Sequence, residues 1–314
     1  MPVLGLDTSN YTTSVAVFDG AEGINESQLL TVRPGELGLR QSDALFQHVQ
    51  RLPGLFERLA QGGAALRDIQ AVGASTRPRA VEGSYMPCFL AGTSQAQSMA
   101  YTLGVPFFAF SHQQGHLAAA AWSAGRLDLL DRPFLAWHLS GGTTELLRVE
   151  PEGVNVRAEI VGGTSDISAG QLIDRTGVLL GQPFPAGKAL DVLYDQGEGD
   201  PCFRVKLNEL SFSLSGMENK VKQLAERGEQ PANIARFALN TVADVVVRAT
   251  QVAQRRWPGL PVLCSGGVAS NRQLRGAMER ACGAVFAQPR FSTDNAMGTA
   301  ILTWRTLEAA EHGT

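Results

Sequence analysis

The feature that most limits the fold of this chain is a strand–loop–strand pattern that occurs twice. In both copies, apolar and β-branched residues flank a short loop of serine, threonine or glycine, which is typical of a β-hairpin. The first copy comprises strands 3–7 and 14–19 around loop 8–13, and the second comprises strands 134–139 and 145–149 around loop 140–144. Two hairpins of one design, about 130 residues apart, predict two related domains.

Each hairpin is followed by alternating strand and helix patterns. After the first hairpin we expect strands at 69–75 and 106–110 with a helix at 82–103 between them. After the second we expect helices at 166–180, 233–256 and 270–282, a strand at 261–264, and a last helix from about 294. Ser165 is a candidate N-cap for the first of these helices. This order predicts an α/β fold of mixed sheets covered by helices. No linker pattern separates the halves, so the two domains are expected to meet at a cleft.

Composition argues against several classes of protein. The chain has 314 residues and a net charge of −3, without the overall basic charge typical of proteins that bind nucleic acid unaided. A large RNA partner would therefore need a local patch or a helper subunit. The four cysteines form no paired motif, which favours reduced thiols. No basic leader and no apolar run of roughly 18 residues is seen, so a cytoplasmic protein with no membrane partner is expected.

Three loops have the composition of phosphate-binding loops. Two are the hairpin loops 8–13 and 140–144, and the third, 265–271, leads from a strand into a helix. Glycines let backbone N–H groups approach an anion, and a helix N-terminus favours negative charge. Any one of these loops is more simply a glycine turn, but three together favour a nucleotide site. Neither a P-loop nor a dinucleotide-binding glycine motif is present.

Two histidines, His112 and His116, are spaced to lie on one face of a helix. Imidazole is a common ligand of Zn and Fe, so the pair can supply two coordination positions. The alternative is two unrelated histidines at a helix start. Asp294, at the expected start of the last helix, is the best candidate for a third ligand. Two imidazoles and one carboxylate leave open the positions that a substrate-binding metal needs.

Seven segments together resemble the Gcp/TsaD family, the transferase component that makes threonylcarbamoyladenosine in tRNA. The resemblance runs nearly end to end. Its most specific segments are His112-Gln-Gln-Gly-His116, Leu139-Ser-Gly-Gly142, Ala169-Gly-Gln-Leu-Ile-Asp174, Phe184-Pro-Ala-Gly187, Phe212-Ser-Leu-Ser-Gly216, Gly266-Gly-Val-Ala-Ser-Asn271 and Ser292-Thr-Asp-Asn295.

The resemblance implies an actin-like fold of the sugar kinase and Hsp70 type, built from duplicated RNase H-like domains with a cleft between them. We expect an N-terminal subdomain at 1–125 that carries the histidine pair. A C-terminal subdomain at 126–290 is expected to carry the nucleotide-binding loops. A final helix at 291–314, which carries Asp294, is expected to pack back on the first domain.

The resemblance also implies a site and a reaction. One divalent metal per chain, Fe or Zn, is held by His112, His116 and Asp294. Threonylcarbamoyl-AMP, made by a partner enzyme, transfers its acyl group to the exocyclic amine of the adenosine beside the anticodon, and AMP leaves. No catalytic acid or base is assigned. The nucleotide is expected against His138, Leu139, Ser140, Gly141, Gly142, Asp174, Gly187 and Asn271.

Two of these nucleotide contacts have simpler alternatives. Asp174 can be a solvated residue on a helix face, and Asn271 can be a helix cap.

Several acidic positions of the family pattern are changed in this chain, which favours a diverged member. The loss of carboxylates is interpreted as making the cleft less negative and more tolerant of another anionic ligand. The positions concerned are Tyr11 and Thr12 in the first loop, Gln114 between the histidines, and Gly163, Ile167 and Gln171 before and within the helix predicted at 166–180.

Two alternative functions stay open. One is a scaffold subunit that binds metal or an adenine nucleotide without catalysis, and the other is a carbamoyltransferase or small-molecule kinase on the same fold. Kinases of this architecture need acidic residues in the cleft, and this chain has few there. For the transferase, tRNA is expected to bind only with helper subunits, and a related actin-like scaffold subunit is a candidate partner.

Overall fold

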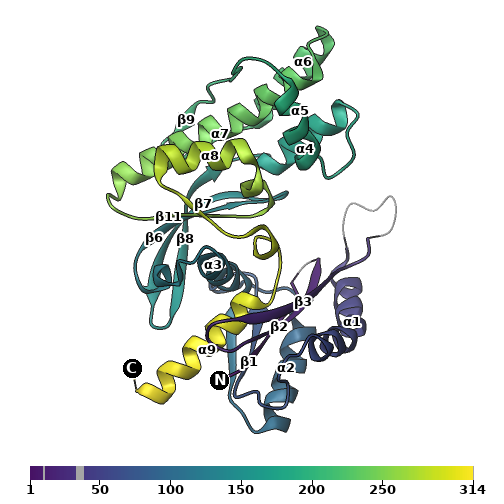
Figure 1. The fold of residues 1–314 in the computed structure, drawn as a ribbon, viewed down its shortest axis with the longest axis vertical. Helices are drawn as coiled ribbons and strands as arrows, with labels where there is room; N and C mark the ends of the chain where they lie inside the picture. The colour runs from purple at the N-terminus through teal and green to yellow at the C-terminus, as the bar shows by residue number, and fades with distance from the viewer. Residues whose placement is uncertain (10, 33–38, 314) are drawn as a thin grey trace. The chain divides into compact units, whose positions relative to one another are not determined.

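The computed structural model describes residues 1–9, 11–32 and 39–313. The chain divides into two compact units (Figure 1). Unit 1 comprises residues 1–131, 151–157 and 290–314, and unit 2 comprises residues 132–150 and 158–289. Each unit has its own sheet and its own core, so each is described by itself.

Unit 1 is built on a five-stranded sheet with the strand order β3-β2-β1-β4-β5. The first two strands form the expected antiparallel hairpin, and the β1–β4 and β4–β5 pairs are parallel. The strands are β1 (Val3–Asp7), β2 (Thr12–Phe18), β3 (Gly23–Leu29), β4 (Val72–Arg77) and β5 (Phe107–Ser111). The helices are α1 (Gln41–Gln61), α2 (Phe89–Leu103), α3 (His112–Ser123) and α9 (Met297–His312), with short 3-10 turns at Leu127–Asp131 and Pro289–Phe291.

Strands β1 and β2 are buried along their whole length, and their apolar residues lie at 3–6 and 15–18. One side of the sheet packs on α1 through Leu52, Leu55 and Leu59. Helix α9 lies directly against β1, because a Cβ atom at Gly5 would stand 2.5 Å from the backbone nitrogen of Ala300. The close approach of α9 to β1 brings the residues just before α9 near the end of β1.

Unit 2 is built on a seven-stranded sheet with the strand order β12-β11-β6-β7-β8-β10-β9. The second expected hairpin is the antiparallel β6–β7 pair, and β11 lies parallel to β6 on its other side. The strands are β6 (Phe134–Leu139), β7 (Thr144–Glu152), β8 (Asn155–Thr164), β9 (Leu207–Asn208), β10 (Ser211–Phe212), β11 (Val262–Ser265) and β12 (Val285–Phe286). The helices are α4 (Ala169–Leu179), α5 (Gly187–Gln196), α6 (Ser215–Glu226), α7 (Pro231–Arg256) and α8 (Arg272–Cys282), with a 3-10 turn at Gly267–Ser270.

The core of unit 2 forms where α7 covers the sheet. Trp137 on β6 is fully buried, and its indole Nε1 donates to Thr250 Oγ1 at 2.8 Å. This bond satisfies the one polar atom of the largest buried side chain in the described structure. Strands β6 and β11, which lead into two of the glycine loops, are therefore fixed against a packed helix.

Three helix boundaries expected from the sequence are wrong. Helix α2 begins at Phe89 rather than near Glu82, because residues 81–84 form a turn in which Gly83 has a φ of +74°. Helix α4 is capped by Ser168 rather than Ser165. Helix α9 begins at Met297, so Asp294 lies in the loop before the helix.

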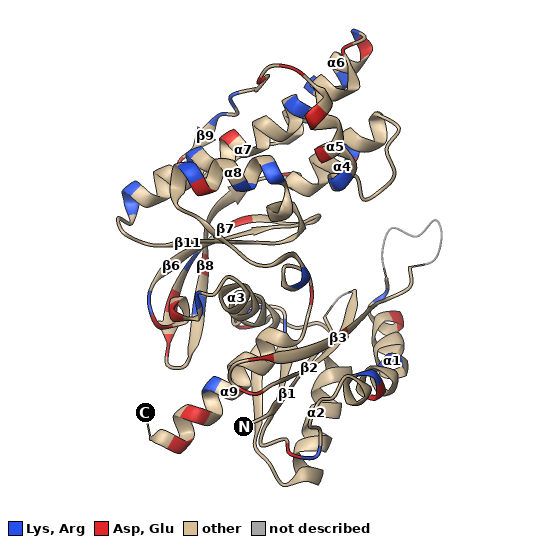
Figure 2. Ribbon diagram, viewed as in Figure 1, with Lys and Arg blue, Asp and Glu red and all other residues tan. Residues whose placement is uncertain are grey.

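Charged residues of both signs are distributed over both units (Figure 2). Many of the cations on the helices of unit 2 lie beside acids, as in the Arg248–Asp244 and Arg275–Glu279 pairs one helical turn apart. The Arg275–Glu279 pair is largely exposed to solvent, whereas the Arg248–Asp244 pair is partly buried. None of the helices in the described ranges is both long and apolar enough to span a bilayer.

Candidate functional site

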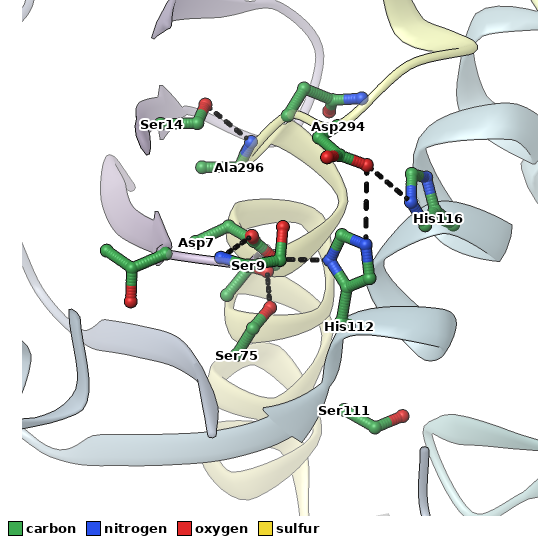
Figure 3. A network of polar contacts seen from close by, with 12 residues as sticks. Asp7, Ser9, Ser14, Ser75, Ser111, His112, His116, Asp294 and Ala296 are labelled. Atoms are coloured by element: carbon green, nitrogen blue, oxygen red, sulfur yellow. Dashed lines mark hydrogen bonds and ion pairs between the residues drawn. The ribbon is translucent and has the colours of Figure 1, made fainter. Parts of the chain in front are cut away.

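The three expected metal ligands come together within unit 1 (Figure 3). Asp294 Oδ1 lies 3.2 Å from His116 Nε2 and 3.5 Å from His112 Nε2. One ligand atom from each residue lies within 4.8 Å of the others. The sequence separates the aspartate from the histidines by about 180 residues, so the fold alone creates this cluster.

The start of helix α3 sets the direction of both imidazoles. Ser111 is the N-cap, and its hydroxyl accepts from the backbone N–H of Gln114, whose side-chain Oε1 accepts from the backbone N–H of Ser111. This capping box begins the helix at His112. The i, i+4 spacing then places the His112 and His116 rings on one face, with their centroids 4.2 Å apart.

Glycines let α3 and α9 approach each other closely. A Cβ atom at Gly298 would lie 1.7 Å from the carbonyl oxygen of Gly115, a distance at which no side chain fits. Gly115 lies between the two histidines in sequence, and Gly298 follows Asp294 by one turn. The contact between the two helices therefore brings the aspartate loop beside the imidazoles.

The loop that carries Asp294 is fixed by strands β2 and β3. The backbone N–H of Ala296 donates to Ser14 Oγ at 2.8 Å and to Asn25 Oδ1 at 3.0 Å. Ser14 Oγ in turn donates to Asn25 Oδ1 at 3.1 Å. These contacts hold the backbone two residues after the ligand.

Asp7, at the end of β1, contacts the far side of the His112 ring. Its Oδ2 lies 2.8 Å from His112 Nδ1, and its Oδ1 accepts from the backbone N–H of Ser9 at 2.9 Å. Asp7 is only 1% exposed. Burial raises the pKa of this carboxyl, but His112, Ser75 and Ser9 together lower it below its ordinary value. Asp7 is thus an ionised carboxylate inside the protein.

His112 and the two acids that contact it shift one another's pKa values. Burial lowers the pKa of His112, but the neighbouring charges of Asp7 and Asp294 raise it to about 10. Burial likewise raises the pKa of Asp294, while its bonds to His112 and His116 lower that pKa well below 3.8. The positive charge of protonated His112 therefore balances part of the negative charge of the two carboxylates.

The spacing of the three side chains suits a bound metal ion. Nitrogen and oxygen ligands lie about 2.0–2.2 Å from zinc, so two ligands at a tetrahedral angle are about 3.3–3.6 Å apart. The two measured separations, 3.2 and 3.5 Å, lie close to this range. Three protein ligands leave at least one position for substrate or water.

The glycine loop of the second hairpin lies in unit 2, between β6 and β7. Ser140 N–H donates to Thr143 O at 2.8 Å, which closes the turn, and Ser168 Oγ donates to the carbonyl of Gly141 at 2.6 Å. The backbone N–H of Ala169 donates to Thr144 Oγ1 at 2.8 Å. The loop is therefore tied to the start of α4.

Backbone at three of the expected nucleotide contacts is accessible. Apart from its own chain neighbours and helix backbone, a Cβ atom built at Gly141, Gly142 or Gly187 meets no atom of the described residues within 4 Å. Gly187 is the first residue of α5, so its N–H is one of the free donors at a helix start. Small residues here leave room for an anion to approach the backbone.

Asp174 on α4 lines a cavity of about 450 Å³ together with Gly141 of the hairpin loop. One carboxylate oxygen of Asp174 accepts from the backbone N–H of Ala186 at 2.8 Å, which fixes the residue before Gly187. The Phe184 ring, 75% exposed, also lines this cavity. Asp174 is therefore more than a solvated surface residue.

Asn271 caps helix α8, as the simpler interpretation of the sequence expected. Its side-chain oxygen accepts from the backbone N–H of Leu274 at 2.9 Å, and its amide donates to Asp191 on α5. The loop before Asn271 lies at the same end of the sheet as His138, because Ser265 on β11 pairs in parallel register with His138 on β6. The ends of β6 and β11 are therefore neighbours, and they are followed along the chain by two of the expected nucleotide loops.

Four positions at which the family's acids are missing also have local structural roles in this fold. Gln114 is buried in the α3 capping box, and its Nε2 donates to Val156 O at 2.8 Å. Gly163 has a φ of +129°, and a Cβ atom there would lie 2.2 Å from the carbonyl of Thr144. Ile167 packs against the core of unit 2. Gln171 both caps α4 and lines the cavity.

Sequence reasoning did not identify Asp7 or Asn25 as residues that support the site. For Asp7 a signal exists, because a carboxylate at the end of an apolar, buried strand needs a partner inside the protein. Asn25 lies in an ordinary polar strand, and its contact with Ala296 depends on chain segments about 270 residues apart. No sequence signal was available for it.

Comparison with protein families gives a match over most of the chain. A family model described as "TsaD: tRNA N6-adenosine threonylcarbamoyltransferase" matches residues 27–301. A protein of that name from Thermus thermophilus is 34% identical over 97% of this chain and 93% of its own length. Another, from Ralstonia pickettii, is 31% identical over 94% of this chain and 88% of its own length.

Solved structures confirm the expected actin-like fold class. Full-length HypF, in its phosphate- and nucleotide-bound form, has a TM-score of 0.62 at 14% identity and covers 98% of this chain and 56% of its own. A ROK family glucokinase from Streptomyces griseus has a TM-score of 0.51 at 14% identity, covering 97% of this chain and 100% of its own. At these identities the likeness concerns the fold alone.

Proposed function

We propose an acyl-transfer function that proceeds from one premise: the chain belongs to the TsaD family of tRNA N6-adenosine threonylcarbamoyltransferases. The threonylcarbamoyl group passes from threonylcarbamoyl-AMP to the exocyclic amine of the adenosine beside the anticodon of tRNA, and AMP leaves. The observation that carries the proposal is the cluster of His112, His116 and Asp294, which the family-matched chain assembles from two distant segments.

We propose that these three side chains hold one divalent metal, Fe or Zn. Imidazole and carboxylate ligands suit both ions. When bound, the metal supplies a Lewis acid that polarises the acyl group. Asp294 keeps its negative charge because its pKa is well below 3.8, and the α3 capping box keeps both imidazoles on the same side of the helix.

For the nucleotide we propose the loops of unit 2. The backbone of the loop that follows His138 and Leu139, with the Ser140 hydroxyl, donates hydrogen bonds to the phosphate and stabilises the charge that develops as AMP leaves. The accessible backbone at Gly141, Gly142 and Gly187 supports this assignment. Asp174 has one carboxylate oxygen bonded to Ala186, and the other is available for a ribose hydroxyl. Asn271 contributes near the adenine or ribose.

The wider organisation follows from the same proposal. The functional divisions are the N-terminal subdomain 1–125, the C-terminal subdomain 126–290 and the final helix 291–314. The net charge of −3 supports tRNA binding with helper subunits rather than by this chain alone. One helper is a related actin-like scaffold subunit, and the setting is the cytoplasm.

The first test measures bound metal in the full-length protein, purified without chelators. The parent and a matched His312→Ala control, which changes an exposed histidine of unit 1, are expected to carry about one Fe or Zn per chain. The His112→Ala/His116→Ala double variant is expected to carry none, because two of three ligands are removed. Equal metal in the parent and the double variant would contradict the proposed ligands.

The second test measures the reaction. The parent is incubated with tRNA, a source of threonylcarbamoyl-AMP and its helper subunits, and the digested tRNA is analysed for threonylcarbamoyladenosine by mass spectrometry. The parent and the His312→Ala control are expected to form the product, and the double variant is not. A parent that binds metal and an adenine nucleotide but forms no product would favour the scaffold function instead.

A further inference from the structure

We propose that Asp7 is a positioning residue for the metal ligand His112. Its carboxylate accepts the proton on His112 Nδ1 and so leaves Nε2, on the opposite side of the ring, as the atom that binds metal. This inference rests on the proposed metal site and adds a residue that is not itself a ligand.

The geometry of the ring supports this assignment. Asp7 Oδ2 lies 2.8 Å from His112 Nδ1, while His112 Nε2 lies 3.5 Å from Asp294 Oδ1 (Figure 3). The two carboxylates therefore contact opposite nitrogens of one imidazole. A neutral imidazole carries a proton on one nitrogen only, and a metal binds the other. With the Nδ1 proton fixed by Asp7, the Nε2 lone pair faces the site that His116 and Asp294 share.

Asp7 is itself held in place, so it can orient its neighbour. It stands at the end of the fully buried strand β1, and its Oδ1 accepts from the backbone N–H of Ser9 at 2.9 Å. The Ser75 side chain also donates to it. Ser75 in turn contacts Thr299 on α9 at 3.0 Å between hydroxyl oxygens. An acceptor bound from several directions cannot rotate away from the imidazole.

Asp7 does not have the position of a fourth ligand. The one group of side chains in the described ranges that satisfies the distance limits for a metal site contains His112, His116 and Asp294 but not Asp7. Carboxylates that accept from the second nitrogen of a metal-bound histidine raise its basicity and fix its orientation. Their loss typically weakens metal affinity by about 10- to 100-fold.

The test compares two carboxyl-to-amide variants of the full-length protein, with Co²⁺ alone as the probe. Asp7→Asn keeps the shape of the side chain but removes the obligate acceptor, because an amide can donate to Nδ1 and reverse the tautomer. We expect its Co²⁺ affinity, measured by optical titration at several pH values, to fall by about 10- to 100-fold. The matched control is Asp19→Asn, a turn carboxylate of unit 1 that accepts from the backbone N–H groups of Ala21 and Glu22. It is expected to bind Co²⁺ as the parent does.

The outcomes separate the role of Asp7 from the metal site on which it rests. A folded Asp7→Asn variant that binds Co²⁺ with the affinity of the parent at every pH would overturn the role of Asp7 and leave the site intact. A parent that binds no Co²⁺ would overturn both.

If Asp7→Asn does not fold, nitrogen NMR of the imidazoles in the parent with Zn²⁺ decides the question. A proton retained on Nδ1 of His112 and a metal-shifted Nε2 is the expected result. Metal bound at Nδ1 would overturn the proposal.

Discussion

The two candidate sites differ in what they are made of. In unit 1 the metal ligands are partly buried side chains, held by contacts that run from buried Asp7 through His112 to Asp294. In unit 2 the nucleotide loops are mainly backbone, with accessible space at Gly141, Gly142 and Gly187. A site of partly buried charges depends on each neighbouring group, whereas a site of backbone donors depends on the path of the chain. Substitutions should therefore damage the two sites in different ways.

The largest expected effect on stability comes from glycine substitutions in unit 2. They test whether the path of the backbone governs the nucleotide loops. Gly266 has a φ of +97°, and a Cβ atom there would lie 2.1 Å from the carbonyl oxygen of Leu139. Gly266→Ala is expected to lower the free energy of unfolding by about 3 kcal/mol, because strain and a backbone clash add. Thermal and denaturant unfolding measure this change.

Gly141→Ala is the matched control for stability, because its new methyl group enters open space. Its free energy of unfolding should stay within about 1 kcal/mol of the parent. Its affinity for AMP, measured by calorimetry, should fall about tenfold or more, since the methyl group occupies the path of the phosphate. If Gly141→Ala binds AMP as the parent does, the hairpin loop does not contact the phosphate. The contrast between a side-chain site in unit 1 and a backbone site in unit 2 would then be wrong.

A pair of glutamine substitutions compares the two capping boxes directly. Gln114 in unit 1 donates its amide to Val156 O, whereas Gln171 in unit 2 uses its side-chain oxygen to accept from Ser168 N–H. Gln114→Glu removes a buried donor and places a carboxylate against a carbonyl, which should destabilise the protein by about 2 kcal/mol. Gln171→Glu keeps its acceptor and should change stability by less than about 0.5 kcal/mol.

Denaturant unfolding of both glutamine variants, in the presence of chelator, measures this difference. An equal loss of unfolding free energy in both variants would show that the buried amide of Gln114 stabilises the protein no more than the amide of Gln171 does. A stabilised Gln114→Glu variant would show that the Val156 contact does not require an amide donor.

The smallest expected effect is the pH dependence of the metal-free protein. The pKa of His112 is raised from 6.5 to about 10 in the folded chain, so its contribution to stability is complete below about pH 6.5 and is lost as the pH rises toward 10. The pKa of Asp294 is lowered, so its contribution is present above about pH 4 and is lost in stronger acid. In unit 2, burial raises the pKa of Asp166, but hydrogen bonds from Ser213, Ser215 and Leu214 lower it below its ordinary value.

We therefore expect the melting temperature in chelator to fall between pH 6 and pH 9 for the parent. The slope should be smaller for His112→Gln, which has no titrating ring. Metal affinity should rise over the same interval, because the imidazole must lose a proton before Nε2 can bind. A parent whose melting temperature rises with pH would contradict the proposed coupling between His112 and the two carboxylates.

Some of the site was predictable because its signals are local. The i, i+4 spacing of His112 and His116 describes one helix face whatever the rest of the chain does, and the structure confirms that both rings lie together. The two hairpins were likewise predictable, since alternating β-formers around a small polar loop specify neighbouring strands. Helix boundaries were less predictable, because the capping residue is selected by the final path of the backbone, as at Ser168.

By itself, the sequence determined the duplicated hairpins, the glycine loops, the histidine pair and, through its motifs, the family. Tertiary structure alone decided that Asp7 contacts His112, that Asn25 fixes the loop of Asp294, and that the Gln114 side chain donates to Val156 O. The physical reason is the range of the interactions. Spacing and turn chemistry act over a few residues, whereas a buried carboxylate finds its partner only when helices and strands from both ends of the chain have packed together.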